Sequence, residues 1–180
     1  SKYLNFNHPY QKFIRYTLEF FTESQIKKNC IGIDGCNAPQ YAFSLNNLAN
    51  SMVNLIKAKN TNHEYFLPIN SIIKSINKFP NLIGGYNSFD TDIIKITKGK
   101  IFCKRGAEGI LLFADFQKKI GGIIKIIDGN NRAIPPIAMK IFFEMNLLNS
   151  KEKKNLNHWI KPKIYNIAKK KVGQIISKIQ

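Results

Sequence analysis

The sequence predicts an α+β fold in which an antiparallel sheet is flanked by helices. Three short apolar runs in the middle of the chain, broken by glycines and charged turns, are typical of antiparallel strands. Apolar residues at helical spacing precede these runs, and a long apolar helical segment follows them. This order indicates one layered domain, and no domain boundary is evident between residues 1 and 180.

Three helices are predicted before the sheet. Pro9 suits a first turn because its φ is fixed, and apolar residues recur at helical spacing as far as Phe21. Ser44 is a candidate N-cap for a second helix. A third helix is expected over Ile69 to Lys78, ended by Pro80. The buried stripe expected for the second helix is Leu45, Leu48, Ala49, Met52, Val53 and Ile56.

Turn signals separate the remaining elements. Ile31 to Ile33 reads as a short strand that runs into the turn 34–37, and Gly84 to Ser88 reads as a flexible loop. Asp90 is a candidate cap for a helical turn over 91–96. The strands are expected at 101–104, 109–116 and 121–127, the last two joined by a hairpin at 117–119; a helix over 132–148 and a strand over 172–179 follow.

The composition is that of a folded and strongly basic chain. Its 180 residues are 44% hydrophobic, which is enough for a core, and its formal net charge is +17. Such a charge allows nucleic-acid binding as an alternative function, which salt-dependent binding would test. The charge is mostly lysine spread along the chain, without an Arg-rich arm or a zinc-finger spacing. We therefore expect a solvated basic surface and not a nucleic-acid-binding module.

The cysteines and the apolar runs indicate the compartment. Cys30, Cys36 and Cys103 are odd in number and fit no disulfide framework, which favours a reducing, cytoplasmic setting. No apolar run has the length of a membrane span, and no secretory signal opens the chain. The first four residues resemble the end of a helix that is entered from upstream.

Ordered short motifs carry a family resemblance that covers almost the whole chain. The most specific are Asp34-Gly35-Cys36-Asn37-Ala38-Pro39 and Lys104-Arg105-Gly106-Ala107-Glu108-Gly109. The other blocks are His8 to Gln11, Ala42 to Leu45, Gly84-Gly85 with Asp90-Thr91, Lys125 to Gly129 with Arg132-Ala133, and Asn166 with Val172-Gly173. Together they resemble the asparaginase II family, the rhizobial-type or class 3 L-asparaginases.

The resemblance implies a fold like serine β-lactamases and glutaminases, and hydrolysis of L-asparagine to L-aspartate and ammonia. It also implies a homodimer, a nucleophilic serine in an S-x-x-K arrangement, and zinc as a cofactor with ligands from a C-S-G-K-H motif. The C-S-G-K-H motif is not found, and no Ser-x-x-Lys position in this sequence matches the family site; Ser71 and Lys74 have the spacing but lie outside the family blocks. We therefore expect the chain to be the C-terminal part of one asparaginase domain, incomplete at its N-terminus and inactive alone.

The resemblance also assigns roles to individual residues. Lys104 is the candidate catalytic residue, because a lysine that is desolvated or near another cation can take the proton of a serine hydroxyl. Cys36 is the candidate zinc ligand. Asp34 is the candidate group for the substrate's polar atoms, and the N–H groups of Gly106 and Ala107 are candidate donors to an oxyanion.

Each assignment has a plainer alternative. Without the resemblance Lys104 reads as an ordinary strand lysine, and with it we favour the site; Cys36 also reads as a free thiol, and Asp34 as a turn residue that binds its own backbone. Asp90 and Thr91 match the family without an assigned role, and Ser88 stands where the family often has arginine. The three histidines, His8, His63 and His158, have neither catalytic nor metal-ligand spacing.

Two geometric expectations follow from the resemblance. Asp34, Cys36 and Lys104 should converge at one edge of the sheet, and apolar surface should be exposed near Asp34 and Cys36. The substrate remains open between asparagine and glutamine, because one methylene changes binding by only about 1–3 kcal/mol in a pocket.

Overall fold

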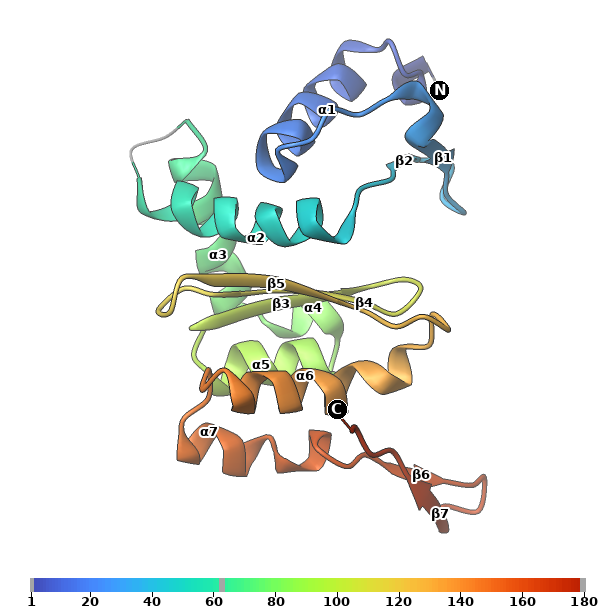
Figure 1. Ribbon diagram of the computed structural model, residues 1–180, viewed down its shortest axis with the longest axis vertical. Coiled ribbons are helices and arrows are strands. Elements are labelled where there is room, and N and C mark those ends of the chain that lie inside the picture. Colours follow the sequence, from blue (N-terminus) through green and yellow to red (C-terminus); the bar gives the residue numbers. More distant parts are fainter. Residues whose placement is uncertain (1, 62–63, 179–180) are drawn as a thin grey trace.

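The computed structural model describes residues 2–61 and 64–178, and it confirms the predicted α+β class. Helices lie on both faces of a central sheet, as Figure 1 shows. The helices are α1 Pro9–Thr22, α2 Leu45–Asn60, α3 Phe66–Lys78, α4 Asn81–Gly84, α5 Phe89–Ile96, α6 Ile134–Glu144 and α7 Ser150–Asn155, with 3-10 turns η1 Lys2–Leu4, η2 Lys28–Cys30, η3 Asn131–Ala133 and η4 Asn157–Trp159. None of the helices in the described ranges is both long and apolar enough to cross a membrane.

The central sheet has three antiparallel strands in the order β3-β4-β5. They are β3 Ile101–Gly106, β4 Ile110–Asp115 and β5 Ile120–Lys125. Phe113 pairs with Cys103 on one side and with Gly122 on the other, so the register is continuous. The three predicted strands and the hairpin at 117–119 are confirmed.

The two faces of the sheet bury different sets of residues. Ile101 and Cys103 of β3 are fully buried in the main core, which α5 and α6 complete with residues such as Phe89 and Phe142. Phe102, between them in sequence, packs into a smaller cluster with α2 and α3. Alternate residues of a strand point to opposite faces, so the β3 sequence serves both layers.

Helix α2 packs directly on β5 through a glycine. A Cβ on Gly121 would lie 2.6 Å from the backbone nitrogen of Val53, so only glycine permits this approach. Ser44 caps α2 as predicted, since its hydroxyl accepts a hydrogen bond from the N–H of Asn47. The predicted buried stripe is wrong in part, because Leu45 is exposed and only Ile56 of the six is fully buried.

Helix α5 and its N-cap begin two residues earlier than the sequence predicted. Ser88, and not Asp90, is the N-cap, and its hydroxyl accepts a hydrogen bond from the N–H of Thr91. Asp90 lies in the first helical turn and is 1% exposed. Gly84 belongs to α4, so the predicted loop is shorter, and α3 starts three residues before Ile69.

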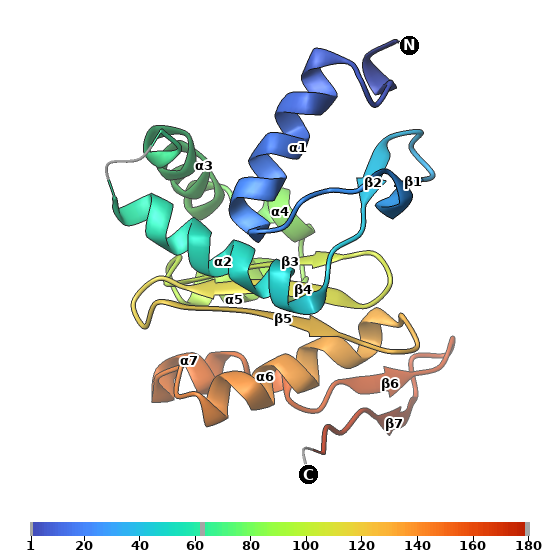
Figure 2. The ribbon, with the colours of Figure 1, turned by 45° about the horizontal axis from the view of Figure 1, so that its top comes forward.

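The C-terminal segment forms a hairpin away from the central sheet. Its strands, β6 Lys163–Tyr165 and β7 Lys171–Gln174, pair with each other beyond α6, as Figure 2 shows. The predicted strand over 172–179 is therefore shorter, and its last residue lies outside the described ranges. The predicted helix over 132–148 is also shorter, because a 3-10 turn precedes α6.

Candidate functional site

The Asp34 turn lies at the tip of a small hairpin. Strands β1 Ile31–Ile33 and β2 Pro39–Tyr41 pair antiparallel and leave residues 34–38 as the connection. Asp34 Oδ1 accepts hydrogen bonds from the N–H of Cys36 (2.8 Å) and of Ala38 (2.9 Å). Asn37 has a φ of 66°, a left-handed value that asparagine tolerates in turns. The carboxylate therefore holds its own turn.

The same hydrogen bonds set the ionisation of Asp34. The N–H of Ala38 is the largest cause that lowers the pKa of this carboxyl, and the Cys36 N–H and the Gln40 amide act in the same direction. Oδ2 accepts one hydrogen bond, from Gln40 Nε2 at 2.9 Å. A carboxylate has about four acceptor positions, so one position on Oδ2 remains for a ligand. The structure thus shows that Asp34 binds its own turn, and these hydrogen bonds leave one acceptor position on Oδ2 for the expected contact with the substrate.

Cys36 offers an exposed thiol on the same turn. A structural zinc ion needs four ligands, and a catalytic one needs three from protein. Across the described ranges, no group of three histidine, cysteine, aspartate or glutamate residues is arranged to hold a metal. The described residues do not by themselves fit a zinc ion, and Cys36 is at most one ligand of such a site.

Lys104 lies near the end of β3, on the sheet face that α2 and α3 cover. It shares this face with Phe102, two residues earlier. Its side chain is exposed, and its Nζ donates a hydrogen bond to the carbonyl oxygen of Arg105 at 2.7 Å. The described residues therefore do not supply the desolvation that a lysine base needs.

Three of the resembling blocks meet at the turn between β3 and β4. The guanidinium of Arg105 forms an ion pair with the buried carboxylate of Asp90, and the Arg105 N–H donates to the same carboxylate at 2.9 Å. On the other side of the turn, Lys125 Nζ donates to the carbonyl oxygens of Glu108 (2.5 Å) and Ile126 (2.9 Å). Segments distant in sequence thus fix the turn from both sides.

The turn itself depends on tight backbone packing. Gly109 has a φ of 68°, and a Cβ there would lie 2.8 Å from the Cβ of Ile126. The Ile126 N–H donates to the Gly109 carbonyl oxygen at 2.8 Å. Gly106 pairs with Ile110 at the end of the sheet, and the next residue, Ala107, is exposed in the turn. The Ala107 N–H has no hydrogen-bond partner within 2–61 and 64–178, as a donor to an oxyanion requires.

The two halves of the candidate site lie on the same side of the sheet but are not in bonded contact. Figure 1 shows β1 and β2 above the sheet, toward the end that carries the β3–β4 turn. No hydrogen bond or ion pair between described residues joins Asp34 or Cys36 to Lys104. The assigned roles therefore remain predictions, and the structure adds the positions of the residues.

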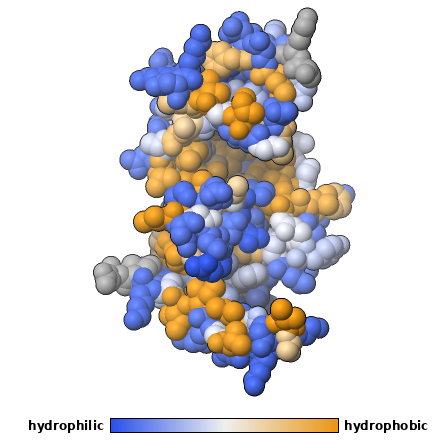
Figure 3. All heavy atoms as spheres, turned by 90° about the vertical axis from the view of Figure 1, so that its right-hand side faces the viewer, coloured by the Kyte–Doolittle hydropathy of each residue, from blue (hydrophilic) through white to orange (hydrophobic). Residues whose placement is uncertain are grey.

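An apolar groove opens between the N-terminal helices and the sheet. It has a volume of about 540 Å³, and Figure 3 shows hydrophobic residues around a hollow below the N-terminal segment. Asp34 and Cys36 do not line it, so this groove is not at the predicted place, although Ile33 beside Asp34 is 64% exposed. Its lining includes Phe13, Leu18 and Phe21 of α1, Leu48, Met52 and Leu55 of α2, Ile69 and Ile72 of α3, and Leu112 of β4.

Sequence reasoning gave no role in the site to three buried residues, Asp90, Thr91 and Cys103. Asp90 anchors Arg105, and the Thr91 hydroxyl donates to the Gly85 carbonyl oxygen at 2.8 Å and so ties the preceding loop to α5. Cys103 is fully buried, and this burial is the largest cause that raises the pKa of its thiol well above the usual value. The Asp-Thr pair was visible in the sequence, but its partners are made by the fold. His63 lies outside the described residues.

The comparisons with known proteins support the motif-based resemblance. The chain matches the model of the L-asparaginase II family over residues 1–177. A search of curated proteins found no match. The family match covers both the Asp34 turn and the β3–β4 turn, together with the segments that pack around them. The chain therefore belongs to the L-asparaginase II family of amide hydrolases.

Proposed function

We propose that this chain provides part of the active site of an L-asparaginase, which hydrolyses L-asparagine to L-aspartate and ammonia. The family match over residues 1–177 is the observation that carries the proposal. Lys104 is proposed as the catalytic lysine, and the serine nucleophile is proposed to come from polypeptide outside this sequence. Among the described residues, Ser71 and Lys74 are exposed on α3, which gives no support to an alternative pair there.

The proposed chemistry gives each residue one task. Lys104 Nζ leaves the Arg105 carbonyl and takes the proton of the serine hydroxyl, which then attacks the side-chain amide carbon of asparagine. The Ala107 N–H group stabilises the oxygen that becomes negative, and the Gly106 N–H joins it only when it leaves its pairing with Ile110. The free position on Asp34 Oδ2 accepts a hydrogen bond from the substrate's α-ammonium group. The proton on Lys104 then passes to the amide nitrogen, which leaves as ammonia, and water hydrolyses the resulting ester to release L-aspartate and restore the serine.

The fold and cofactor proposals follow the family. We propose a serine-β-lactamase-like architecture for the complete enzyme, a homodimeric and cytoplasmic protein, and Cys36 as one zinc ligand. Bound zinc would fix the position of the Asp34–Cys36 turn through the thiolate. No step of the proposed reaction passes through the metal.

The test is a chimera that supplies the serine-bearing segment of a family member ahead of Ser1. We expect ammonia release from L-asparagine by the chimera but not by the 180-residue chain. Lys104→Ala in the chimera should lower the turnover number by about 10²-fold or more, the size of a general-base contribution. Lys74→Ala on α3 is the matched control and should leave the rate unchanged.

Two outcomes of this experiment would change the proposal. Ammonia release by the 180-residue chain, lost in its Lys104→Ala variant, would place the nucleophile within the present sequence. Faster hydrolysis of L-glutamine than of L-asparagine by the chimera would reassign the substrate and keep the mechanism.

A further inference from the structure

A separate cavity, lined mainly by polar side chains, lies on the opposite side of the central sheet from Asp34. It is open, has a volume of about 770 Å³, and is lined by residues of η4 and of the β6–β7 hairpin. Figure 1 shows this hairpin below the sheet. Six polar side chains line it: Asn157, His158, Lys161, Lys163, Tyr165 and Gln174. This cavity takes no part in the proposed hydrolysis, because every residue assigned to that reaction lies elsewhere.

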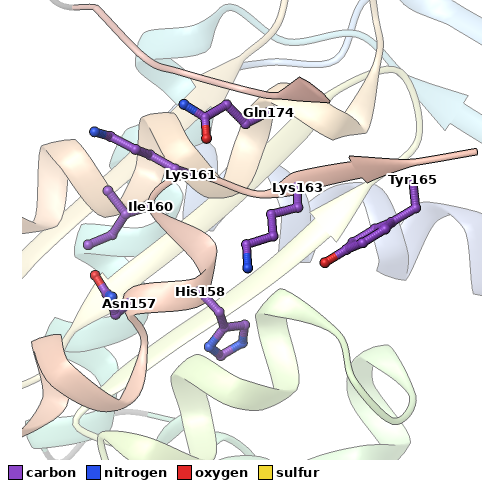
Figure 4. A pocket seen from close by; sticks show the side chains of 7 residues that line it. All are labelled: Asn157, His158, Ile160, Lys161, Lys163, Tyr165 and Gln174. Carbon is purple, nitrogen blue, oxygen red and sulfur yellow. The ribbon is translucent and has the colours of Figure 1, made fainter. Parts of the chain in front are cut away.

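Three polar side chains, those of Lys163, Tyr165 and His158, point into the same part of this cavity. Figure 4 shows the Lys163 ammonium group and the Tyr165 hydroxyl pointing toward the ring of His158, whereas Lys161 extends in another direction. Within the described ranges, Lys163 and Tyr165 form no side-chain hydrogen bond or ion pair. These two groups are therefore available to a ligand without breaking an existing interaction.

Asp92 and Trp159 contact the imidazole of His158 and fix its position. Its Nε2 lies 3.2 Å from Asp92 Oδ2, and the indole Nε1 of Trp159 donates to the same oxygen at 2.9 Å. The two rings pack with their centroids 4.9 Å apart. Asp92 and Trp159 thus orient the imidazole of His158. Among residues 2–61 and 64–178, no carboxylate lines the cavity itself.

We propose that this cavity binds the phosphate group of a small molecule through Lys163, Tyr165 and His158. A phosphate group has a charge of about −1.5 to −2 at pH 7 and three acceptor oxygens, which matches the Lys163 ammonium and the Tyr165 hydroxyl as donors beside the oriented ring of His158. An amino acid fits less well, because its ammonium group would meet lysines and find no carboxylate in the lining. The site therefore differs in ligand class from the proposed asparagine site.

The test is a titration of the 180-residue chain with inorganic phosphate, followed by NMR amide shifts at constant ionic strength. We expect saturable shifts confined to residues 157–174. Lys163→Gln should weaken phosphate binding about tenfold and Tyr165→Phe about threefold, since charged hydrogen bonds contribute more than neutral ones. Lys74→Gln on α3 removes the same charge at a distance and should change nothing.

Several results would overturn the proposal. These are equal shifts with chloride or L-aspartate, equal weakening by Lys74→Gln and Lys163→Gln, or binding of oligonucleotide without binding of phosphate. Circular dichroism checks that each variant is folded, and Lys163→Met provides a second neutral side chain. Absence of saturable binding to the wild-type chain at millimolar phosphate would also reject the site.

Discussion

The ion pair between Arg105 and Asp90 offers the sharpest test of how the β3–β4 turn is fixed. Arg105→Met keeps the length of the side chain and removes its charge. In this variant the Asp90 carboxylate loses its cationic partner but keeps the hydrogen bond from the backbone N–H of residue 105. The Asp90 side chain is 1% exposed, so water cannot replace the lost guanidinium group. Removing one partner of a fully buried pair costs about 3–5 kcal/mol. Because Arg105 is 26% exposed and one hydrogen bond survives, we expect about 2–3 kcal/mol.

Urea unfolding measures this loss of stability directly. For a chain of this size, 2–3 kcal/mol corresponds to a fall in Tm of about 5–10 °C. Arg132→Met is the matched control, because the pair of Arg132 with Asp128 is 62% and 56% exposed and should contribute less than about 0.5 kcal/mol. The double variant with Asp90→Asn removes the unpaired charge and should recover part of the stability.

The control variants also define the result that would refute the reasoning. If Arg105→Met is no less stable than Arg132→Met, the ion pair does not hold the turn. If the double variant is as unstable as Arg105→Met, the cost comes from lost packing of the side chain and not from an unpaired carboxylate.

Three further predictions concern the sheet, the thiols and the Asp34 turn. Gly121→Val should destabilise the fold by about 1–3 kcal/mol in urea unfolding, because the side chain would collide with α2, whereas an unchanged midpoint would contradict that contact. Cys36 should react with iodoacetamide in the native chain and Cys103 only after unfolding; early modification of Cys103 by mass spectrometry would show that the core opens. Because the pKa of Asp34 is lowered in the folded chain, its ionised carboxylate stabilises the turn fully at a pH above the ordinary pKa of about 3.9. This stabilisation is lost as the pH falls through the lowered pKa and the carboxylate is protonated. The Ala38 amide shift should follow that titration in the wild type but not in Asp34→Ala, and identical titrations would exclude the hydrogen bond.

Local signals in the sequence predicted the strands and most helix starts. The β3 to β5 runs were recognisable because apolar residues alternate between two covered faces and glycines mark the turns. Ser44 was recognisable as a cap because its hydroxyl acts only three residues away. The α2 stripe was predicted less well, because its contact with β5 is made by backbone against Gly121 and not by a row of large side chains.

Long-range partners were the part that sequence reasoning could not supply. Asp90 has the residue type of a helix cap, and only the position of β3 beside α5 shows that it binds Arg105 instead. In the same way, an isolated strand pattern near residue 172 does not reveal that its partner is β6 and not the central sheet. The candidate residues themselves came from a family resemblance, and their roles depend on contacts that no spacing encodes.

The two halves of the candidate site differ in how they are held. The β3–β4 turn is fixed from both sides, by Asp90 through Arg105 and by Lys125 through the Glu108 carbonyl, and it rests on the core face of the sheet. The Asp34 turn is stabilised mainly by its own hydrogen bonds, and its hairpin is connected to the sheet through the packing of α1 and α2. Among the described residues no hydrogen bond or ion pair joins Lys104, near the end of β3, to the Asp34 turn, so the proposed site needs a further segment that contacts both. This accounts for an exposed Lys104 whose ammonium group binds a carbonyl of its own strand, and it places the missing desolvation on whatever packs against both turns.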